Sequence, residues 1–242
     1  MMHAGGIRLD HAMGLQRLWV TPDGAAPSEG AYLLYPFAEL LGLLALESQR
    51  NRAIVVAEDL GTVPTGFRER ISRAGLLGMR VLWFERGAKG DFLPPKRWDA
   101  QAAALSTTHD LPTLAGWWTG HDISWRTTLG ASPAASKQAR KTRAQERQQL
   151  WANLKQAKCA KGAPPASNRP AKFADAAISS LAKTPCPLVL IPIEDFVGEV
   201  EQPNIPGTID EHPNWRRRLK TKSPLSNPDA KRRIAILKAE RP

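Results

Sequence analysis

The sequence predicts an α/β fold with parallel strands, and three observations support this prediction. Short apolar runs that suit buried strands alternate with amphipathic stretches that suit helices. Right-handed βαβ units usually connect such strands. Acidic residues recur directly after the apolar runs, where barrel enzymes carry their chemistry. These observations leave two architectures open, a doubly wound open sheet and part of a closed (β/α) barrel.

The individual elements follow from apolar periodicity and from the residues at element ends. Phe37, Leu40, Leu41 and Leu44 recur at helical spacing and predict a helix with one face turned inward. The next helix begins near Pro64 and ends near a glycine. Strands are expected at 5–9, 53–57, 78–84, 102–106 and 187–193, helices at 36–50, 64–75, from 111 and at 168–183, and a proline-rich linker at 161–170.

Composition excludes several classes of protein. The chain has 242 residues, of which 42% are hydrophobic and 24% charged, which is ordinary for a globular protein with a sizeable core. No apolar run reaches the roughly 18 residues of a membrane span, and the first residues do not resemble a secretory signal. The two cysteines suit a cytoplasmic protein. Neither a metal-ligand cluster nor a nucleotide-binding loop is evident, so we expect no metal and no cofactor.

The net charge of +11 is concentrated in two segments. Residues 137–161 hold eight Lys or Arg against one Glu, and residues 215–242 hold ten against two acidic residues. The rest of the chain is mildly acidic, which argues against a nucleic-acid partner. We therefore predict a main domain at 1–214 with a basic helical insert at 137–161 whose charges form a solvated face, and a basic tail at 215–242.

Four carboxylates follow the expected strands: Asp10, Glu58, Glu85 and Asp110. Like charges gathered at one rim cost free energy unless they are protonated, paired or functional. The arrangement therefore indicates acid–base or nucleophilic chemistry on a neutral substrate rich in hydroxyl groups. Glu85 has no role in this hypothesis.

Strand alternation suggests distinct roles for the acids. Arg8 and Asp10 share one face of their strand, so the guanidinium favours an ionised Asp10 that can act as a nucleophile. Glu58 follows an apolar strand, which favours a protonated acid that can donate. A pair of acids in which one is kept ionised and the other protonated is typical of glycosidases. The alternatives are a structural Arg8–Asp10 ion pair and a helix-capping role for Glu58.

Four motifs together resemble glycoside hydrolase family 77, the 4-alpha-glucanotransferases or amylomaltases. They are "IRLDHAMGLQRLWVTPDGAAPSEGAYLLYP", "VVAEDLGTVP", "STTHDLPTLAGWW" and "EQPNIPGTIDEHPNWRRRL". They occur in the order of the family with similar gaps. The chain departs from the family pattern at Leu111, where many members have Asn after the catalytic Asp.

The resemblance implies a retaining transfer of α-1,4-glucan segments, as in starch, glycogen or maltooligosaccharides. It makes Asp10 the nucleophile, Glu58 the general acid/base and Asp110 the transition-state stabiliser. By the same likeness, Arg8 and His109 contact the substrate, and a loop from Asn204 to Gly207 covers it. Trp83, Trp117 and Trp118 are expected in the core.

Relative to the family, the chain begins at about the fourth barrel strand. The predicted fold is therefore a partial (β/α)8 TIM barrel, about strands 4 to 8 with their helices. Such a portion has unpaired strand edges, so we expect it to associate with itself or with an N-terminal half of the enzyme. The alternatives to a working transferase are a non-catalytic glucan-binding remnant, half of a split enzyme and, ranked last, a nucleic-acid-binding module.

Overall fold

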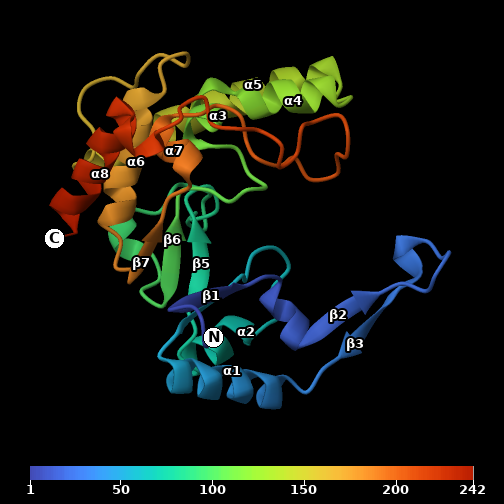
Figure 1. Cartoon of the computed structure of the whole chain (residues 1–242). Helices are drawn as coiled ribbons and strands as arrows, with labels where there is room; N and C mark the ends of the chain where they lie inside the picture. Colours follow the sequence, from blue (N-terminus) through green and yellow to red (C-terminus); the bar gives the residue numbers. More distant parts are fainter. Residues whose placement is uncertain (242) are drawn as a thin grey trace. The chain divides into compact units, whose positions relative to one another are not determined.

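The α/β prediction is confirmed by the computed structural model, which describes residues 1–241 (Figure 1). Every strand and helix predicted in the main domain is present. The strands are β1 (Gly6–Leu9), β2 (Arg17–Val20), β3 (Ala31–Leu34), β4 (Ile54–Ala57), β5 (Gly78–Val81), β6 (Ala102–Leu105) and β7 (Leu188–Leu190). The helices are α1 (Phe37–Asn51), α2 (Phe67–Arg73), α3 (Leu114–Thr119), α4 (His121–Thr128), α5 (Pro133–Gln156), α6 (Ala171–Ala182), α7 (Ile193–Val197) and α8 (Pro228–Glu240).

The chain forms two compact units. The first comprises Met1–Met79 with Gln101–Ala103, and the second comprises Arg80–Ala100 with the chain from Ala104 onward. Strand β5 begins in the first unit and ends in the second. The predicted boundary between residues 214 and 215 divides the chain differently and stays a prediction.

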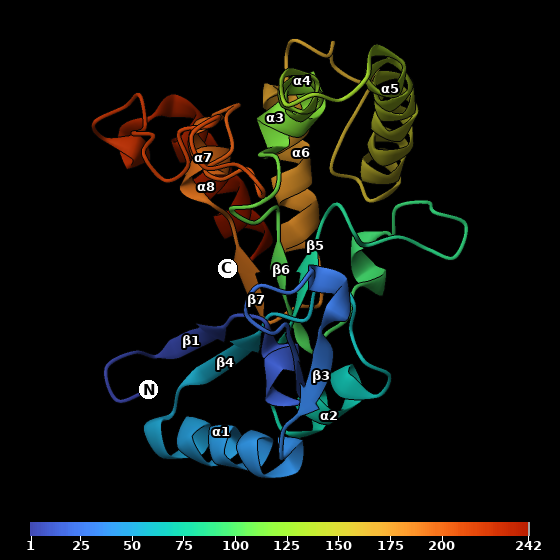
Figure 2. The same cartoon turned by 90° about the vertical axis from the view of Figure 1, so that its right-hand side faces the viewer.

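In the first unit, β1 and β4 run parallel, and side chains of the helices α1 and α2 form a hydrophobic core together with those of β4 (Figure 2). Phe37 and Leu41 of α1 are buried as predicted, whereas Leu40 and Leu44 are only half-buried. Phe37 stacks on Phe67 of α2 with ring centroids 5.2 Å apart. A parallel bridge between Val56 and Leu77 links β4 to the segment that leads into β5.

The antiparallel hairpin β2–β3 is absent from the sequence prediction. Its strands pair from Arg17 opposite Leu34 to Val20 opposite Ala31. The ten-residue connection between them lacks the two-residue turn that signals a hairpin in a sequence. Most of its side chains are exposed, and Trp19 and Tyr32 pack edge to face across the strands.

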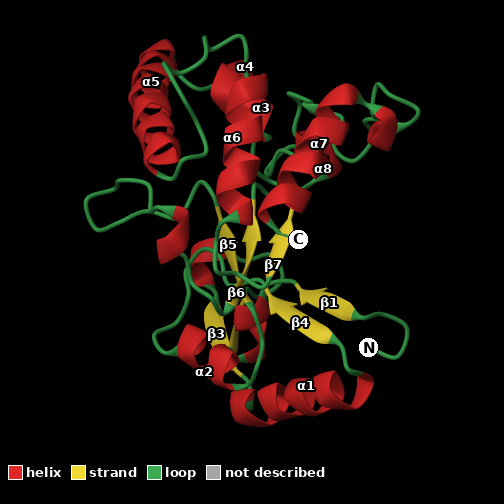
Figure 3. Ribbon diagram, turned by 90° about the vertical axis from the view of Figure 1, so that its left-hand side faces the viewer, coloured by secondary structure: helices red, strands yellow, loops and turns green. Residues whose placement is uncertain are grey.

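The second unit has a core of aromatic side chains, and the expected burial of Trp83, Trp117 and Trp118 is confirmed. Trp118 is fully buried and stacks on Phe173 of α6 with ring centroids 4.3 Å apart. Trp117 stacks on Trp83 at 4.7 Å. These contacts tie α3 to α6, beside the sheet β5–β6–β7 (Figure 3).

Three predicted strands differ from their expected ranges by one residue, and two, β5 and β7, are shorter by at least three residues. Strand β5 ends at Val81 because the chain then turns, with the Phe84 amide donating to the Val81 carbonyl at 2.8 Å. Strand β7 ends at Leu190 because Pro192 caps the start of α7. The short helices α4 and α7 are likewise absent from the sequence prediction.

The basic insert is helix α5, which begins one residue after its N-cap Ser132. Its interpretation as a solvated face is wrong for one side of the helix. Arg143 is buried there together with Leu150, Trp151 and Leu154. The Arg143 guanidinium contacts the Asp122 carboxylate of α4 at 2.8 and 2.9 Å and the Trp117 carbonyl at 2.6 Å.

Part of the basic tail is also structured. Helix α8 packs on α6, and the side chain of Asn227 caps its first turn. Arg233 is buried, donates to the carbonyls of Asp195 and Phe196, and pairs with Asp175 of α6 at 3.0 Å. No helix within residues 1–241 has the length and apolar character that a membrane crossing requires.

Candidate active site

The predicted site residues of the first unit follow two neighbouring strands. Leu9 of β1 lies opposite Ala57 of β4, so Asp10 and Glu58 occupy equivalent positions just beyond the two strand ends. The backbone amide of Glu58 donates to the Leu9 carbonyl at 2.9 Å, which continues the ladder. Parallel pairing therefore brings these two acids together at one edge, as the sequence predicts.

The prediction that Arg8 and Asp10 share one face is confirmed by their ion pair, with Arg8 in β1 and Asp10 directly after it. Arg8 Nη1 lies 2.6 Å from Asp10 Oδ1. The Asp10 side chain is 74% exposed, so one side of the carboxylate is accessible to a ligand. The guanidinium holds the carboxylate without burying it.

The Glu58 carboxylate is oriented by backbone donors. The His11 amide donates to Glu58 Oε2 at 2.9 Å, and the Leu60 amide donates to Oε1 at 2.8 Å. His11 has a left-handed backbone with φ of 43°, and the two residues that follow it, Ala12 and Met13, are buried in the core. The turn after Asp10 is thereby fixed, and Glu58 has a more polar setting than its apolar strand suggests.

In the second unit, Asp110 has a partner at each carboxylate oxygen. Asn204 Nδ2 donates to Asp110 Oδ1 at 2.6 Å, and His109 Nε2 lies 3.3 Å from Oδ2. The Asn204 amide donates to the His109 carbonyl at 3.2 Å. Three predicted site residues, His109, Asp110 and Asn204, are thus assembled although Asp110 and Asn204 are 94 positions apart in the sequence.

Gly207 lies in the same loop and forms part of a turn. The Thr208 amide donates to the Ile205 carbonyl at 3.2 Å, and Gly207 has φ of 82°. Proline followed by a residue with positive φ is typical of a type II turn, which favours glycine at the second position. The structure gives Gly207 a conformational role in shaping the loop.

A carboxylate that the sequence analysis did not single out anchors this loop to α4. Glu201 accepts a hydrogen bond from Trp125 Nε1 at 2.9 Å and lies 2.9 Å from His121 Nε2. Arg217 lies 3.5 Å from the same carboxylate. Although burial raises the pKa of Glu201, the hydrogen bonds and cations outweigh it and lower the pKa below its usual value.

Asp195 is a second carboxylate that the sequence analysis missed, although it also lies close after a strand. It accepts hydrogen bonds from Ser106 Oγ at 2.5 Å and from the Leu114 amide at 2.7 Å. Burial raises its pKa to about 6. Because the side chain is 1% exposed, Asp195 ties the end of β6 to the start of α3 and does not face a ligand.

The raised pKa of Asp195 predicts a pH-dependent stability. Its folded pKa exceeds the unfolded value of 3.8, so the folded state binds this proton more tightly. Protonation of Asp195 therefore stabilises the folded state fully below pH 3.8. This stabilisation is lost as the pH rises through about 6, which changes the free energy of unfolding by about 3 kcal/mol. We expect Asp195→Asn to gain that amount relative to the wild type between pH 4 and 7 in urea unfolding. Asp210→Asn, which changes an exposed acid, should show no such gain. If the free energy of unfolding of Asp195→Asn and of the wild type changed with pH in parallel, the raised pKa of Asp195 would be contradicted.

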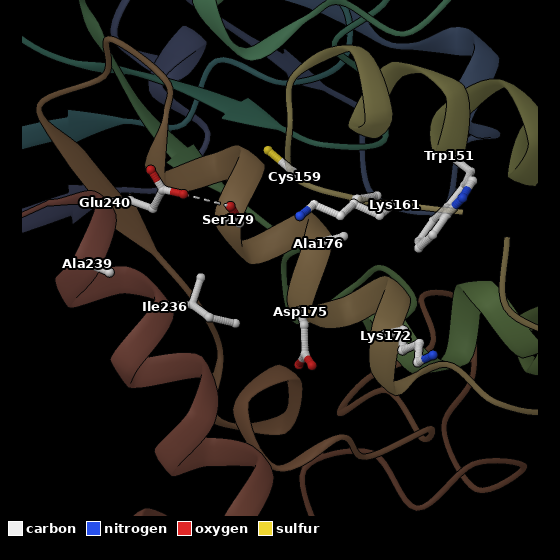
Figure 4. Close-up of a pocket in the computed structure, with 11 residues that line it drawn as sticks. Trp151, Cys159, Lys161, Lys172, Asp175, Ala176, Ser179, Ile236, Ala239 and Glu240 are labelled. Carbon is white, nitrogen blue, oxygen red and sulfur yellow. Dashed lines mark hydrogen bonds between the residues drawn. The ribbon is translucent and has the colours of Figure 1, made fainter. Parts of the chain in front are cut away.

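Three depressions on the surface of the second unit are lined by residues other than the predicted site residues. One of about 360 Å³ lies between α6 and α8, and its lining includes Lys172, Asp175 and the hydrogen-bonded pair Ser179 and Glu240 (Figure 4). Within residues 1–241, no three His, Cys, Asp or Glu side chains are grouped to hold a metal ion.

Comparison with known proteins gives concordant matches. A family described as 4-alpha-glucanotransferase matches residues 1–223. The 4-alpha-glucanotransferase of Mycobacterium tuberculosis (strain H37Rv) is 38% identical over 95% of this chain, and that of Haemophilus influenzae is 32% identical over 90%. The crystal structure of amylomaltase from Corynebacterium glutamicum has a TM-score of 0.88 over 97% of the chain at 28% identity.

The chain spans about a third of the length of these proteins. It covers 31% of the mycobacterial relative, 32% of the Haemophilus relative and 36% of the Corynebacterium chain. The matched part contains both groups of site residues described above.

Proposed function

Because the chain belongs to the family of 4-alpha-glucanotransferases, we propose that it transfers α-1,4-glucan segments through Asp10, Glu58 and Asp110. The observation that carries this proposal is the pairing of β1 with β4, which sets Asp10 and Glu58 side by side. Neighbouring strands lie about 4.8 Å apart, and retaining glycosidases hold their two carboxyl groups about 5 to 5.5 Å apart.

The first step uses the two acids of the first unit. An Asp10 oxygen attacks C1 of the glucan, and the bond from C1 to the glycosidic oxygen breaks. Glu58 gives its proton to that oxygen, so the leaving segment departs as a neutral alcohol. The ion pair with Arg8 orients the Asp10 carboxylate, while the amides of His11 and Leu60 hold the Glu58 carboxyl group in place.

The second step regenerates the acids. A hydroxyl group of an acceptor glucan gives its proton to Glu58 and attacks C1, and the bond between C1 and Asp10 breaks. Asp110 stabilises the positive charge that develops on the sugar in both steps, and Asn204 fixes the orientation of its carboxylate. His109 and Arg8 contact the substrate.

The architecture we propose is part of a (β/α) barrel, about strands 4 to 8. The pairing of β1 with β4, the bridge from Val56 of β4 to Leu77 just before β5 and the sheet β5–β6–β7 support it, as does the similarity to the Corynebacterium structure. The free thiols Cys159 and Cys186 support a cytoplasmic setting. We propose α-1,4-glucans as the substrates and an N-terminal portion of the enzyme as a partner.

The test is a transfer assay with the purified 242-residue chain. Maltotriose is expected to yield glucose together with longer maltooligosaccharides, because transfer conserves the number of glycosidic bonds. Mass spectrometry of the products distinguishes transfer from hydrolysis, which yields shorter products only. A folded chain that binds maltoheptaose but makes no product would instead support the glucan-binding alternative or half of a split enzyme.

A further inference from the structure

Trp215 combines two features that are unusual for a tryptophan. Its side chain is 65% exposed, although large aromatic side chains are mostly buried. Its backbone has φ of 61°, in the left-handed region that a bulky residue rarely adopts. Strained conformations persist where the surrounding structure imposes them, and they cluster at functional sites.

The indole lies beside the Asp110 group. The ring centroids of Trp215 and His109 are 5.0 Å apart with planes tilted by 47°. His109 Nε2 in turn lies 3.3 Å from Asp110 Oδ2, so the His109 ring contacts both Trp215 and the carboxylate proposed to act in the reaction. An exposed aromatic surface is therefore connected through His109 to the polar groups of Asp110 and Asn204.

The surrounding loop holds Trp215 in this position. Its amide donates to the Pro203 carbonyl at 3.1 Å. The preceding residue, Asn214, accepts from the Ile205 amide at 3.0 Å and donates to Thr208 at 2.8 and 3.0 Å. Two residues after Trp215, the side chain of Arg217 lies 3.5 Å from Glu201, which is anchored to α4. The left-handed conformation is thus imposed from both sides.

We propose that Trp215 is a glucan-binding residue on which a glucose unit stacks next to Asp110. A glucopyranose has an apolar C–H face and a polar rim of hydroxyl groups. A fixed, exposed indole can bury that face at little cost in conformational entropy, while His109 and Asn204 meet the rim. This inference rests on the proposed function and adds a specificity-determining residue to it.

The test compares maltoheptaose binding by variants at position 215, measured by isothermal titration calorimetry on the full chain. Trp215→Asn removes the ring but suits the left-handed backbone, so the loop is retained. Trp215→Phe keeps an aromatic face. Leu225→Ala, a control at an equally exposed apolar side chain of the same unit, removes surface outside the loop.

We expect the Kd for maltoheptaose to rise about tenfold in Trp215→Asn, the upper end of what an aromatic contact contributes, and to be largely restored in Trp215→Phe. Leu225→Ala should bind as the wild type does. Unchanged affinity in Trp215→Asn overturns the inference and leaves the proposed function standing. A wild-type chain that does not bind maltoheptaose overturns both.

Discussion

Replacing Asp10 by Asn is expected to abolish glucan transfer. The amide is nearly isosteric, but it is neutral and cannot form or release the bond to C1. The loss in rate should be at least about 10⁴-fold, the order found when one essential member of a catalytic set is removed. Arg8 also loses the anion that it contacts at 2.6 Å, but the exposed position of Asp10 keeps the cost in folding stability small.

The measurement is glucose release from maltotriose, with the affinity for maltoheptaose as a second readout. Asp23→Asn is a matched control, because Asp23 is an exposed acid of the same unit outside the strand ends. The control should keep its activity, and Asp10→Asn should still bind the glucan. If the transfer rate of Asp10→Asn stayed within about tenfold of the wild-type rate, Asp10 would not be the nucleophile, because removal of a nucleophile causes a larger loss.

Replacing Arg143 by Met should cause the largest loss of stability. The substitution removes the buried cation that contacts both oxygens of the Asp122 carboxylate and leaves only Arg126, an exposed side chain, which costs about 3 to 5 kcal/mol. Burial raises the pKa of Asp122, but Arg143 and Arg126 outweigh it and lower the pKa. The stabilisation is therefore present above pH 3.8 and is lost as the pH falls through the folded pKa.

Urea unfolding at pH 7 measures this loss. Lys141→Met changes an exposed cation of the same helix and should alter the free energy of unfolding by less than about 0.5 kcal/mol. The double variant Arg143→Met with Asp122→Leu should recover most of the stability, because an apolar pair can replace a buried ion pair. Equal losses in the single and double variants would show that the Asp122 charge is not the cause.

The sequence was most informative where local pattern and long-range structure agree. Strands β1 and β4 were predictable because their apolar runs are short and end in charged residues, and the common face of Arg8 and Asp10 followed from strand alternation. The helices α1, α2 and α6 were predictable from periodicity and from flanking proline and glycine residues.

Features that depend on distant partners were not predictable. The burial of Arg143 depends on Asp122, 21 residues earlier, and nothing in a run of basic residues distinguishes it from its exposed neighbours. The anchor of Glu201 joins residues 76 positions apart. The family resemblance implied that Asp110 and the loop from Asn204 both meet the substrate, but the contact between Asn204 and Asp110, like the exposure and backbone of Trp215, required coordinates.

The hairpin β2–β3 carries most of its stability within itself. Its edge-to-face aromatic pair, the cation over the Tyr32 ring at 4.2 Å and the hydrogen bond from Trp19 to the Pro27 carbonyl all join residues 17–34 to one another. A two-stranded ribbon with few external contacts is marginally stable, so we expect its amides to exchange with solvent before those of β4. Any molecule that covers the hairpin must therefore supply the free energy of ordering it, which makes affinity at this surface sensitive to how rigid the ribbon is beforehand.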